Sequence, residues 1–189
     1  MRAAVILIAV ALGASESATD ALHARDAQIR AALPPSGEEV TPEARHRVER
    51  IITKAIDLRG MVEAAMAKKW HQTTEAQHKR LVAAFEQRFR QMSGSDFGTY
   101  RSTKIEYQPE VEVGEGRVNV PTRVVVKGEP TEITYTMRHD PAGWHIVDIV
   151  VDGVSTVANY RASFARIISK EGVEGLIRRL QRNPPSRKS

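Results

Sequence analysis

The 189-residue sequence contains no cysteine. This absence excludes disulfides, iron–sulfur ligation, a thiol nucleophile and an acylated N-terminal cysteine anchor, but it does not fix the cellular compartment. Aromatic residues make up only 5% of the chain, and no run of basic and aromatic residues alternates on a predicted strand. Proteins that stack nucleic-acid bases need such aromatics, so we expect no nucleic-acid partner.

No stretch of the sequence is long and apolar enough to cross a membrane, which takes about 20 residues. The uninterrupted apolar run from Ala3 to Leu12 follows Arg2 and precedes mostly small residues that end at Ala18. This order is typical of an export signal, with an ordinary N-terminal core helix as the alternative. We expect residues 1–18 to be a signal peptide and the mature protein to be exported.

Recognisable catalytic and metal-binding motifs are also missing. The six histidines have no metal-binding spacing. His145 and Asp148 are three residues apart on a predicted strand, so we expect them on opposite faces and not in a dyad. Ser155 precedes a helix as in a nucleophile elbow, but Val157 stands where the second glycine is required, so Ser155 is interpreted as a helix cap. Arg161 is the expected partner of Asp148. We predict no catalytic residue, no metal and no cofactor.

The bulk properties indicate one ordinary domain. The chain is 41% hydrophobic and carries a formal charge of +5. Such a length and composition can bury a sizeable core. The positive charge suits an anionic partner, which could be nucleic acid, anionic lipid or an acidic protein, and the low aromatic content argues against the first of these. We assign residues 19–182 to a single domain and residues 183–189 to a disordered basic tail.

Four segments alternate in β-branched and aromatic residues, which predicts strands. Short turns rich in glycine or proline join them, so the strands should form an antiparallel meander. The expected strands are Ile105 to Val113, Arg117 to Val126, Thr131 to Arg138 and Trp144 to Val151. One face of this sheet must be covered, and the flanking helices are the only candidates.

The segments on both sides of the sheet have helical periodicity. Thr41 and Ser155 are expected N-caps, and Thr74 with Gln77 forms a capping-box pair. The expected helices are Asp20 to Leu33, Pro42 to Ile56 with a helical continuation from Leu58 to Lys68, Glu75 to Met92, Ser155 to Lys170 and a short one from Val173 to Leu180. The fold class is therefore α+β, with a four-stranded meander wrapped by N- and C-terminal helices.

Several motifs resemble the MlaC (toluene-tolerance) family. The C-terminal stretch Asp152-Gly153-Val154-Ser155 followed by Asn159-Tyr160-Arg161 is the most specific of them. Trp70 followed by the Thr74 to Gln77 motif, and Arg117-Val118 leading to Thr122, are similar to the same family. The resemblance covers about Arg45 to Leu180. Leu58, Gly60, the loop from Ser93 to Gly98 and the linker from Pro34 to Glu39 depart from the family pattern.

The resemblance implies a periplasmic carrier that holds a phospholipid or a related two-chain lipid by its acyl chains. It also implies partners: an outer-membrane lipoprotein complex and an inner-membrane ABC transporter with an MCE-domain subunit. Such a carrier maintains outer-membrane lipid asymmetry and is not an enzyme. The implied fold is a curved sheet wrapped by helices around an apolar cavity, similar to NTF2-like and cystatin-like domains. Hopanoid-associated relatives leave the lipid class open.

The apolar stripes of the helices and sheet supply the candidate pocket. From the residues alone, a closed core is favoured over a cavity. On the fourth strand the odd-numbered residues are expected to share one face toward the ligand. The predicted lipid-binding residues are Met61, Met66, Trp70, Leu81, Phe85, Phe89, Tyr107, Val118, Val120, Ile133, Tyr135, Met137, Val147, Ile149, Val151, Tyr160 and Phe164.

Two other functions fit the same fold. An NTF2-like isomerase or dehydratase would need an Asp–His or Tyr–Asp set in a small polar cavity, with Tyr107, Tyr135 and Asp148 as the nearest candidates. A periplasmic chaperone or binding module would have a filled core and an exposed apolar groove. An elongated, dry, apolar cavity would favour the carrier.

Overall fold

The computed structural model describes residues 16–35, 37–93, 97–126 and 128–182. Most of the predicted signal peptide and the whole predicted basic tail lie outside these residues. Glu16 to Ala18 are described and belong to the folded domain, because Ser17 caps the first helix and Ala18 is fully buried.

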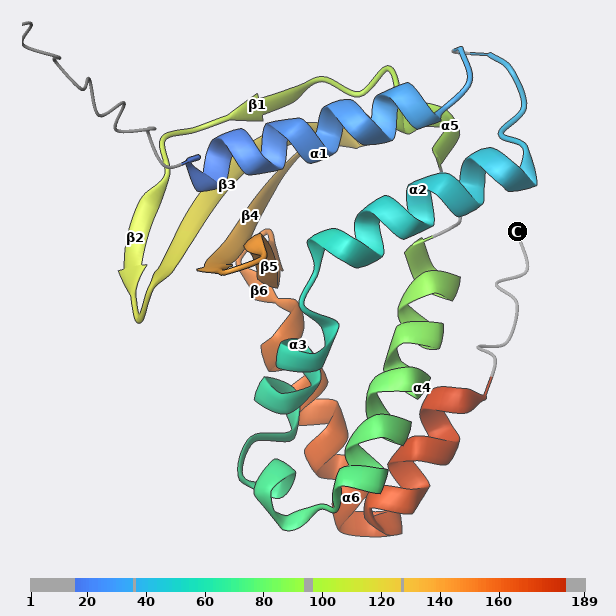
Figure 1. The fold of residues 1–189 in the computed structure, drawn as a ribbon, viewed down its shortest axis with the longest axis vertical. Helices are drawn as coiled ribbons and strands as arrows, with labels where there is room; N and C mark the ends of the chain where they lie inside the picture. Colours follow the sequence, from blue (N-terminus) through green and yellow to red (C-terminus); the bar gives the residue numbers. More distant parts are fainter. Residues whose placement is uncertain (1–15, 36, 94–96, 127, 183–189) are drawn as a thin grey trace, which may run out of the picture.

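An antiparallel sheet lies at one end of the molecule, and its strand order is β1-β3-β4-β5-β6, with β2 also paired to β3 (Figure 1). Consecutive long strands pair as neighbours, which confirms the predicted meander. The strands are β1 (Ile105–Tyr107), β2 (Val111–Gly114), β3 (Arg117–Val126), β4 (Glu129–Asp140), β5 (Gly143–Val151) and β6 (Val154–Ser155).

The predicted first strand is divided into β1 and β2, which both pair with β3. Pro109 lies between them and has no N–H for a ladder hydrogen bond, so the edge strand leaves the sheet there. Only the Gln108 amide still reaches β3, donating to the carbonyl of Pro121 at 2.9 Å. Regular alternation along the predicted strand from Ile105 to Val113 would put Val111 and Val113 on the face of Ile105 and Tyr107, but the break ends this alternation and both valines are exposed.

The helices cover one face of the sheet and extend beyond it (Figure 1). Helix α1 lies across the sheet beside α2, while α3, α4 and α6 pack together at the opposite end of the molecule. The helices are α1 (Ala18–Ala32), α2 (Pro42–Ala55), α3 (Leu58–Met66), the 3-10 helix η1 (Ala67–Gln72), α4 (Glu75–Ser93), α5 (Phe97–Tyr100) and α6 (Thr156–Gln181).

The cap motifs fix the helix starts as predicted. Thr41 accepts a hydrogen bond from the Ala44 amide, and Ser155 accepts one from the Ala158 amide. Thr74 and Gln77 exchange the two bonds of a capping box at 3.0 and 3.2 Å. The two predicted C-terminal helices are confirmed as two helical segments of α6, separated by a kink at Gly172, whose non-helical φ of 67° glycine adopts without strain.

The face of the sheet toward α1 is called the inner face, and it carries the buried side chains of β3: Val118, Val120, Thr122 and Val124. A β-bulge changes the alternation on β5. Thr136 pairs with Asp148 but Met137 pairs with Ile146, so Val147 is an extra residue with no partner across the strand. Ile146 and Ile149 therefore both face inward, and the expectation that the odd-numbered residues of this strand share one face is wrong.

The bulge also overturns the expectation for His145 and Asp148. Their cross-strand partners, Arg138 and Thr136, are two residues apart on β4, so both side chains belong to the outer face. They still form no dyad. The Nε2 atom of His145 is 3.4 Å from the carboxylate of Asp140, and Asp148 has other partners, described below.

Candidate functional site

A cavity of about 240 Å³ lies between the inner face of the sheet and helices α1 and α2. Ile146 and Ile149 of β5 form part of its wall, and Ile105 of β1 adds to it. The two helices supply the opposite wall from their apolar stripes: Leu22, Ile29, Ile52, Ala55 and Ile56. Phe89 of α4 and Tyr100 of α5 also line it. Its lining is dominated by aliphatic and aromatic side chains, as in sites that bind apolar molecules.

The main hydrogen-bonded polar cluster of the cavity centres on Asp26 of α1. One oxygen of this carboxylate accepts a hydrogen bond from the Tyr100 hydroxyl at 2.7 Å, and the other accepts one from Arg30 Nε at 2.8 Å. Arg30 also donates to the carbonyls of Arg101 and Thr103, at 2.7 and 2.8 Å. The carboxylate is thereby held by one ion pair and one phenol, and α1 is fixed to the segment that follows α5.

Three tyrosines surround this cluster. Burial raises the pKa of Tyr135 to about 12, and the nearby charge of Asp26 adds to the effect. Burial raises the pKa of Tyr107 and of Tyr100 further above the usual value of a phenol. All three side chains are therefore uncharged hydroxyls at neutral pH and act as hydrogen-bond donors or acceptors.

Four of the predicted lipid-binding residues line this cavity: Phe89, Tyr107, Tyr135 and Ile149. Most of the others are packed into the main hydrophobic core, where they touch other side chains of the protein. The fully or nearly buried ones are Met61, Met66, Trp70, Leu81, Phe85, Val118, Val120, Met137 and Phe164. Tyr160 packs edge-on against Phe85, at 4.9 Å between ring centroids. Ile133 is half-buried on β4, and Val151 is 38% exposed.

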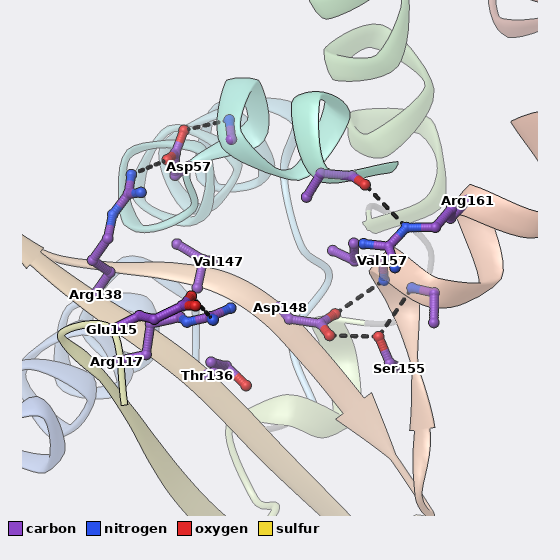
Figure 2. A pocket seen from close by; sticks show the side chains of 13 residues that line it. Asp57, Glu115, Arg117, Thr136, Arg138, Val147, Asp148, Ser155, Val157 and Arg161 are labelled. Carbon is purple, nitrogen blue, oxygen red and sulfur yellow. Dashed lines mark hydrogen bonds and ion pairs between the residues drawn. The ribbon is translucent and has the colours of Figure 1, made fainter. Parts of the chain in front are cut away.

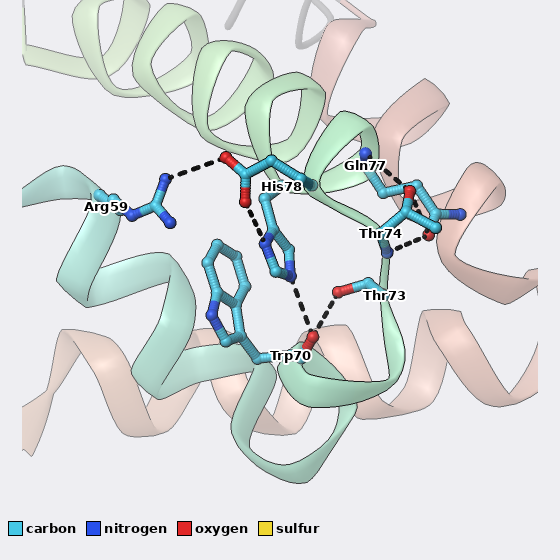
Figure 3. A network of polar contacts seen from close by, with 7 residues as sticks. Arg59, Trp70, Thr73, Thr74, Gln77 and His78 are labelled. Carbon is cyan, nitrogen blue, oxygen red and sulfur yellow. Dashed lines mark hydrogen bonds and ion pairs between the residues drawn. The ribbon is translucent and has the colours of Figure 1, made fainter.

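Trp70 shows why a buried aromatic residue need not line a cavity. Its indole stacks on the His78 ring, with 3.6 Å between centroids, and the Arg59 guanidinium lies over the indole at 5.4 Å (Figure 3). His78 places one ring nitrogen 3.0 Å from the Trp70 carbonyl and the other 3.2 Å from Glu75. This arrangement joins η1 to the start of α4.

A basic groove runs between α1 and α2 and shares Arg25 with the apolar cavity. Its volume is about 350 Å³, and its lining includes four cationic side chains: Arg25, Arg47, Arg50 and Lys54. Among the described residues, no carboxylate pairs with any of the four, and Arg25 donates only to the Gln28 amide oxygen at 3.3 Å. In the sequence, nothing distinguishes these residues from the ordinary polar side of an amphipathic helix.

A second pocket, of about 360 Å³, lies on the outer face of the sheet (Figure 2). Its charges are largely compensated within it: Arg138 pairs with Asp57 at 2.8 Å, and Arg117 pairs with Glu115. Val147 lines this pocket, which places its side chain away from the cavity that Ile149 lines.

The partner expected for Asp148 is wrong. Its carboxylate accepts hydrogen bonds from the Ser155 hydroxyl at 2.5 Å and the Val157 amide at 3.0 Å (Figure 2). Arg161 instead donates from Nε to the Ala64 carbonyl at 3.1 Å. Asp148 is thus a structural anchor for the start of α6. Within the described ranges, no group of three or more His, Asp or Glu side chains could hold a metal ion.

Sequence reasoning missed much of the site. Leu22, Ile29, Ile52 and Ile56 stood in the predicted helix stripes, but nothing in the sequence separated cavity walls from core. Asp26 and Arg30 are four residues apart, a spacing equally usual for a solvent-exposed pair. None of the described helices combines the length and the apolar content needed to span a membrane.

The fold and the cavity define a class: an α+β fold whose sheet and covering helices border a mainly apolar cavity. The sequence profile of the MlaC protein family matches residues 29–182. The chain therefore belongs to the MlaC family, as the sequence motifs indicated.

A solved structure supports the same assignment. A phospholipid-binding protein from Ralstonia solanacearum, determined in complex with a phospholipid, is similar to this chain with 25% sequence identity and a TM-score of 0.73. The similarity covers 88% of this chain and 95% of the other. The helix-covered antiparallel sheet expected from the sequence is the fold of that protein as well. Comparison with curated proteins finds no match.

Proposed function

We propose that this protein is a periplasmic carrier of phospholipid or a related two-chain lipid, with the acyl chains held in the apolar cavity beneath α1. The observation that carries the proposal is this cavity, lined by the inner-face isoleucines of β5 and the stripes of α1 and α2. It lies in a chain of the MlaC family whose structural relative binds a phospholipid. The carrier makes and breaks no covalent bond.

Burial of acyl chains is the driving force for such binding. Each methylene taken out of water contributes about 0.8 kcal/mol, so two long chains strongly favour any site that shields them. The cavity of about 240 Å³ is smaller than the roughly 300–1,000 Å³ of ordinary ligand sites. Loading must therefore move its walls apart. Helix α1 is the covering element, and we expect it to shift away from the sheet when lipid enters.

The basic groove suits the anionic part of the same ligand. Arg25 lines both the cavity and the groove, so a lipid whose chains fill the first can place its phosphate near the second. Four cations without carboxylate partners among the described residues favour a phosphate over an uncharged headgroup. This favours a phospholipid over an uncharged hydrocarbon lipid such as a hopanoid.

An NTF2-like enzyme is the second candidate, and the pair formed by Asp26 and Tyr100 in a small cavity favours it. Both oxygens of Asp26 are already occupied, however, since one accepts from the Tyr100 hydroxyl and the other from Arg30. No histidine is among the described residues that line the cavity. Asp26 is better explained as the group that fixes α1 and Tyr100 in place.

The decisive experiment is native mass spectrometry of the mature protein purified from a bacterial periplasm. We expect a mass increment of one two-chain phospholipid, released by organic extraction and restored by incubation with phospholipid vesicles. A protein that is lipid-free under gentle conditions and stays lipid-free with vesicles would contradict the carrier function. Turnover of a small carbonyl substrate by the same preparation would support the enzyme instead.

The partners of the proposed carrier are an outer-membrane lipoprotein complex and an inner-membrane ABC transporter with an MCE-domain subunit, between which lipid moves to maintain outer-membrane asymmetry. Transfer assays in which each complex is reconstituted in separate vesicles test this. Loaded protein should deliver lipid to one complex and receive it from the other. Equal exchange with vesicles that lack both complexes would contradict a partner-directed pathway.

The structure also limits where a signal peptide could be cleaved. Trp144 Nε1 donates to the Glu16 carbonyl at 2.7 Å, Ser17 caps α1, and Ala18 is buried. Cleavage after Ala18 would remove all three features, so we expect the mature protein to begin at or before Glu16. N-terminal sequencing of protein from its native host checks this, and a mature chain that begins at Thr19 or retains Met1 would contradict it.

A further inference from the structure

Two tyrosine hydroxyls in the cavity have no hydrogen-bond partner among the described residues. Tyr107 of β1 and Tyr135 of β4 both line it, and within the part of the chain that the structure describes neither hydroxyl makes a hydrogen bond. Tyr100 differs, because its hydroxyl donates to Asp26. Among the described residues, every fully buried polar side-chain atom has a hydrogen-bond partner. The hydroxyl of the half-buried Tyr135 has none, so it is not fully buried and must border open space. Because Tyr135 lines the cavity, that space is the cavity.

The surrounding structure holds both rings in position before any ligand arrives. Tyr135 lies in the middle of the sheet, where it pairs with Val120 on one side and Ile149 on the other. The ring of Tyr107 is stacked on His23 of α1, with 3.7 Å between centroids. Both tyrosines belong to paired strands of the sheet, so their hydroxyls stay at the cavity wall when α1 shifts to admit a ligand.

Both groups are suited to donate. Burial keeps the phenols protonated, as the raised pKa of each shows. The nearest carboxylate, Asp26, already accepts from Tyr100 and Arg30. Each hydroxyl faces the cavity with no acceptor among the described residues, so a ligand that offers an uncharged acceptor inside the cavity gains a hydrogen bond and would bind better than one that does not.

We propose that the hydroxyls of Tyr107 and Tyr135 donate hydrogen bonds to an ester carbonyl of the bound lipid, which makes the cavity selective for ester-linked over ether-linked chains. This inference rests on the proposed carrier function and names the lipid class that the same site prefers. The ester carbonyl is the polar group attached directly to an acyl chain, so it enters the cavity with that chain. An ether-linked chain fills the same space without an equivalent acceptor and leaves the hydroxyls unpaired.

The test compares two lipids with the same glycerol phosphate headgroup and chain length, one with two ester links and one with two ether links. Delipidated protein is incubated with an equimolar mixture of both in vesicles, and native mass spectrometry gives the ratio of the two loaded forms. We expect the parent protein to prefer the ester lipid by about tenfold, since each neutral hydrogen bond contributes about two- to tenfold in affinity.

The variant is the double substitution Tyr107→Phe, Tyr135→Phe, which keeps both rings and removes both hydroxyls. It should bind the two lipids about equally, by losing affinity for the ester lipid while keeping its affinity for the ether lipid. The matched control is Tyr160→Phe, because the structure places this ring against Phe85 and Phe164 and outside the cavity lining. It should retain the parental preference.

The outcomes separate the two levels of the argument. A double variant that melts like the parent and keeps the ester preference overturns the role of the tyrosines. A parent protein that loads both lipids equally overturns the selectivity while leaving the carrier function standing. A parent protein that takes up neither lipid refutes the carrier function itself. If the double variant unfolds, Tyr107→Phe and Tyr135→Phe are measured singly, and each should lower the preference by about two- to fourfold.

Discussion

Ile149 and Val147 provide a sharp test of how the cavity is built, because they lie two residues apart on β5 and yet face opposite ways. Ile149 lines the apolar cavity, whereas Val147 is the extra residue of the bulge and lines the outer-face pocket. Regular alternation would have placed both on the same face. Arginine substituted at each position in turn should therefore have very different effects on lipid binding.

The magnitude follows from what the new side chain meets. At position 149 a guanidinium would lie against Ile146, Tyr135 and the stripes of α1 and α2, where the lipid chains are expected. A buried, unpaired charge disfavours binding by several kcal/mol, and the lost aliphatic contact adds about 0.8 kcal/mol per methylene. We expect the affinity of Ile149→Arg for phospholipid to fall at least about 100-fold, or roughly 3 kcal/mol. Val147→Arg should change it less than about threefold, since the pocket it lines has no part in chain binding.

The assay uses delipidated parent and variant proteins that are reloaded from phospholipid vesicles, with the loaded fraction measured by native mass spectrometry. Thermal unfolding of each protein shows whether it is folded, and Ile149→Gln gives an uncharged side chain should Ile149→Arg fail to fold. The reasoning is refuted if folded Ile149→Arg loads as well as the parent. It is equally refuted if Val147→Arg loses as much binding as Ile149→Arg, because the two faces would then not be separate.

Three further predictions follow from particular contacts. Gly60→Ala should lower the free energy of unfolding by about 1 kcal/mol, although alanine favours helices. The reason is that the alanine Cβ would lie 2.3 Å from the Asp57 carboxylate, which caps α3. A variant that is more stable than the parent in urea titration would contradict this. The double substitution Arg50→Glu, Lys54→Glu should weaken binding of anionic phospholipid about tenfold at low salt and much less at high salt. Equal losses at both salt concentrations would contradict electrostatic binding of the headgroup in the basic groove. The pKa of Tyr135 is about 12 in the folded protein against an ordinary 10.0, so the folded state holds the phenol proton more tightly than the unfolded state does. The protonated phenol therefore contributes stability that is fully present below pH 10 and is lost as the pH rises through about 12. Ultraviolet titration of tyrosinate should show this delayed ionisation in the folded protein, and the delay should disappear in urea.

The sheet and the helix starts could be predicted from sequence because their signals are local. Alternation identified the three long strands, and the side chains of Thr41, Thr74 and Ser155 cap the helices they were expected to cap. The break between α2 and α3 was not evident. There Asp57 donates its amide to the Ile146 carbonyl of β5, a long-range pairing that no local pattern encodes. Tertiary pairing thus ended a helix that periodicity alone would have continued.

The cavity was harder to predict for a physical reason. An isoleucine on a helix stripe removes the same apolar area from water whether it touches another core residue or borders a cavity, so the sequence pattern is identical in both cases. Phe85 and Phe89 illustrate this, since they lie one helical turn apart on α4. Phe85 is 1% exposed in the core, and Phe89 lines the cavity. Which of them borders open space depends on how α4 meets α1 and the sheet.

The distribution of charge gives the strongest independent argument about the ligand. On the outer face the arginines of the pocket are largely matched, as Arg138 is by Asp57, so that pocket presents no strong field to a partner. Beside the cavity the balance is different, because Arg25, Arg47, Arg50 and Lys54 line one groove with no described carboxylate paired to them. A ligand that satisfies both features must carry long apolar chains and a negative group at one end. Uncompensated cations next to an apolar cavity therefore favour a phospholipid over a wholly apolar ligand, and we expect its headgroup on the α1–α2 side of the molecule, away from the matched charges of the outer face.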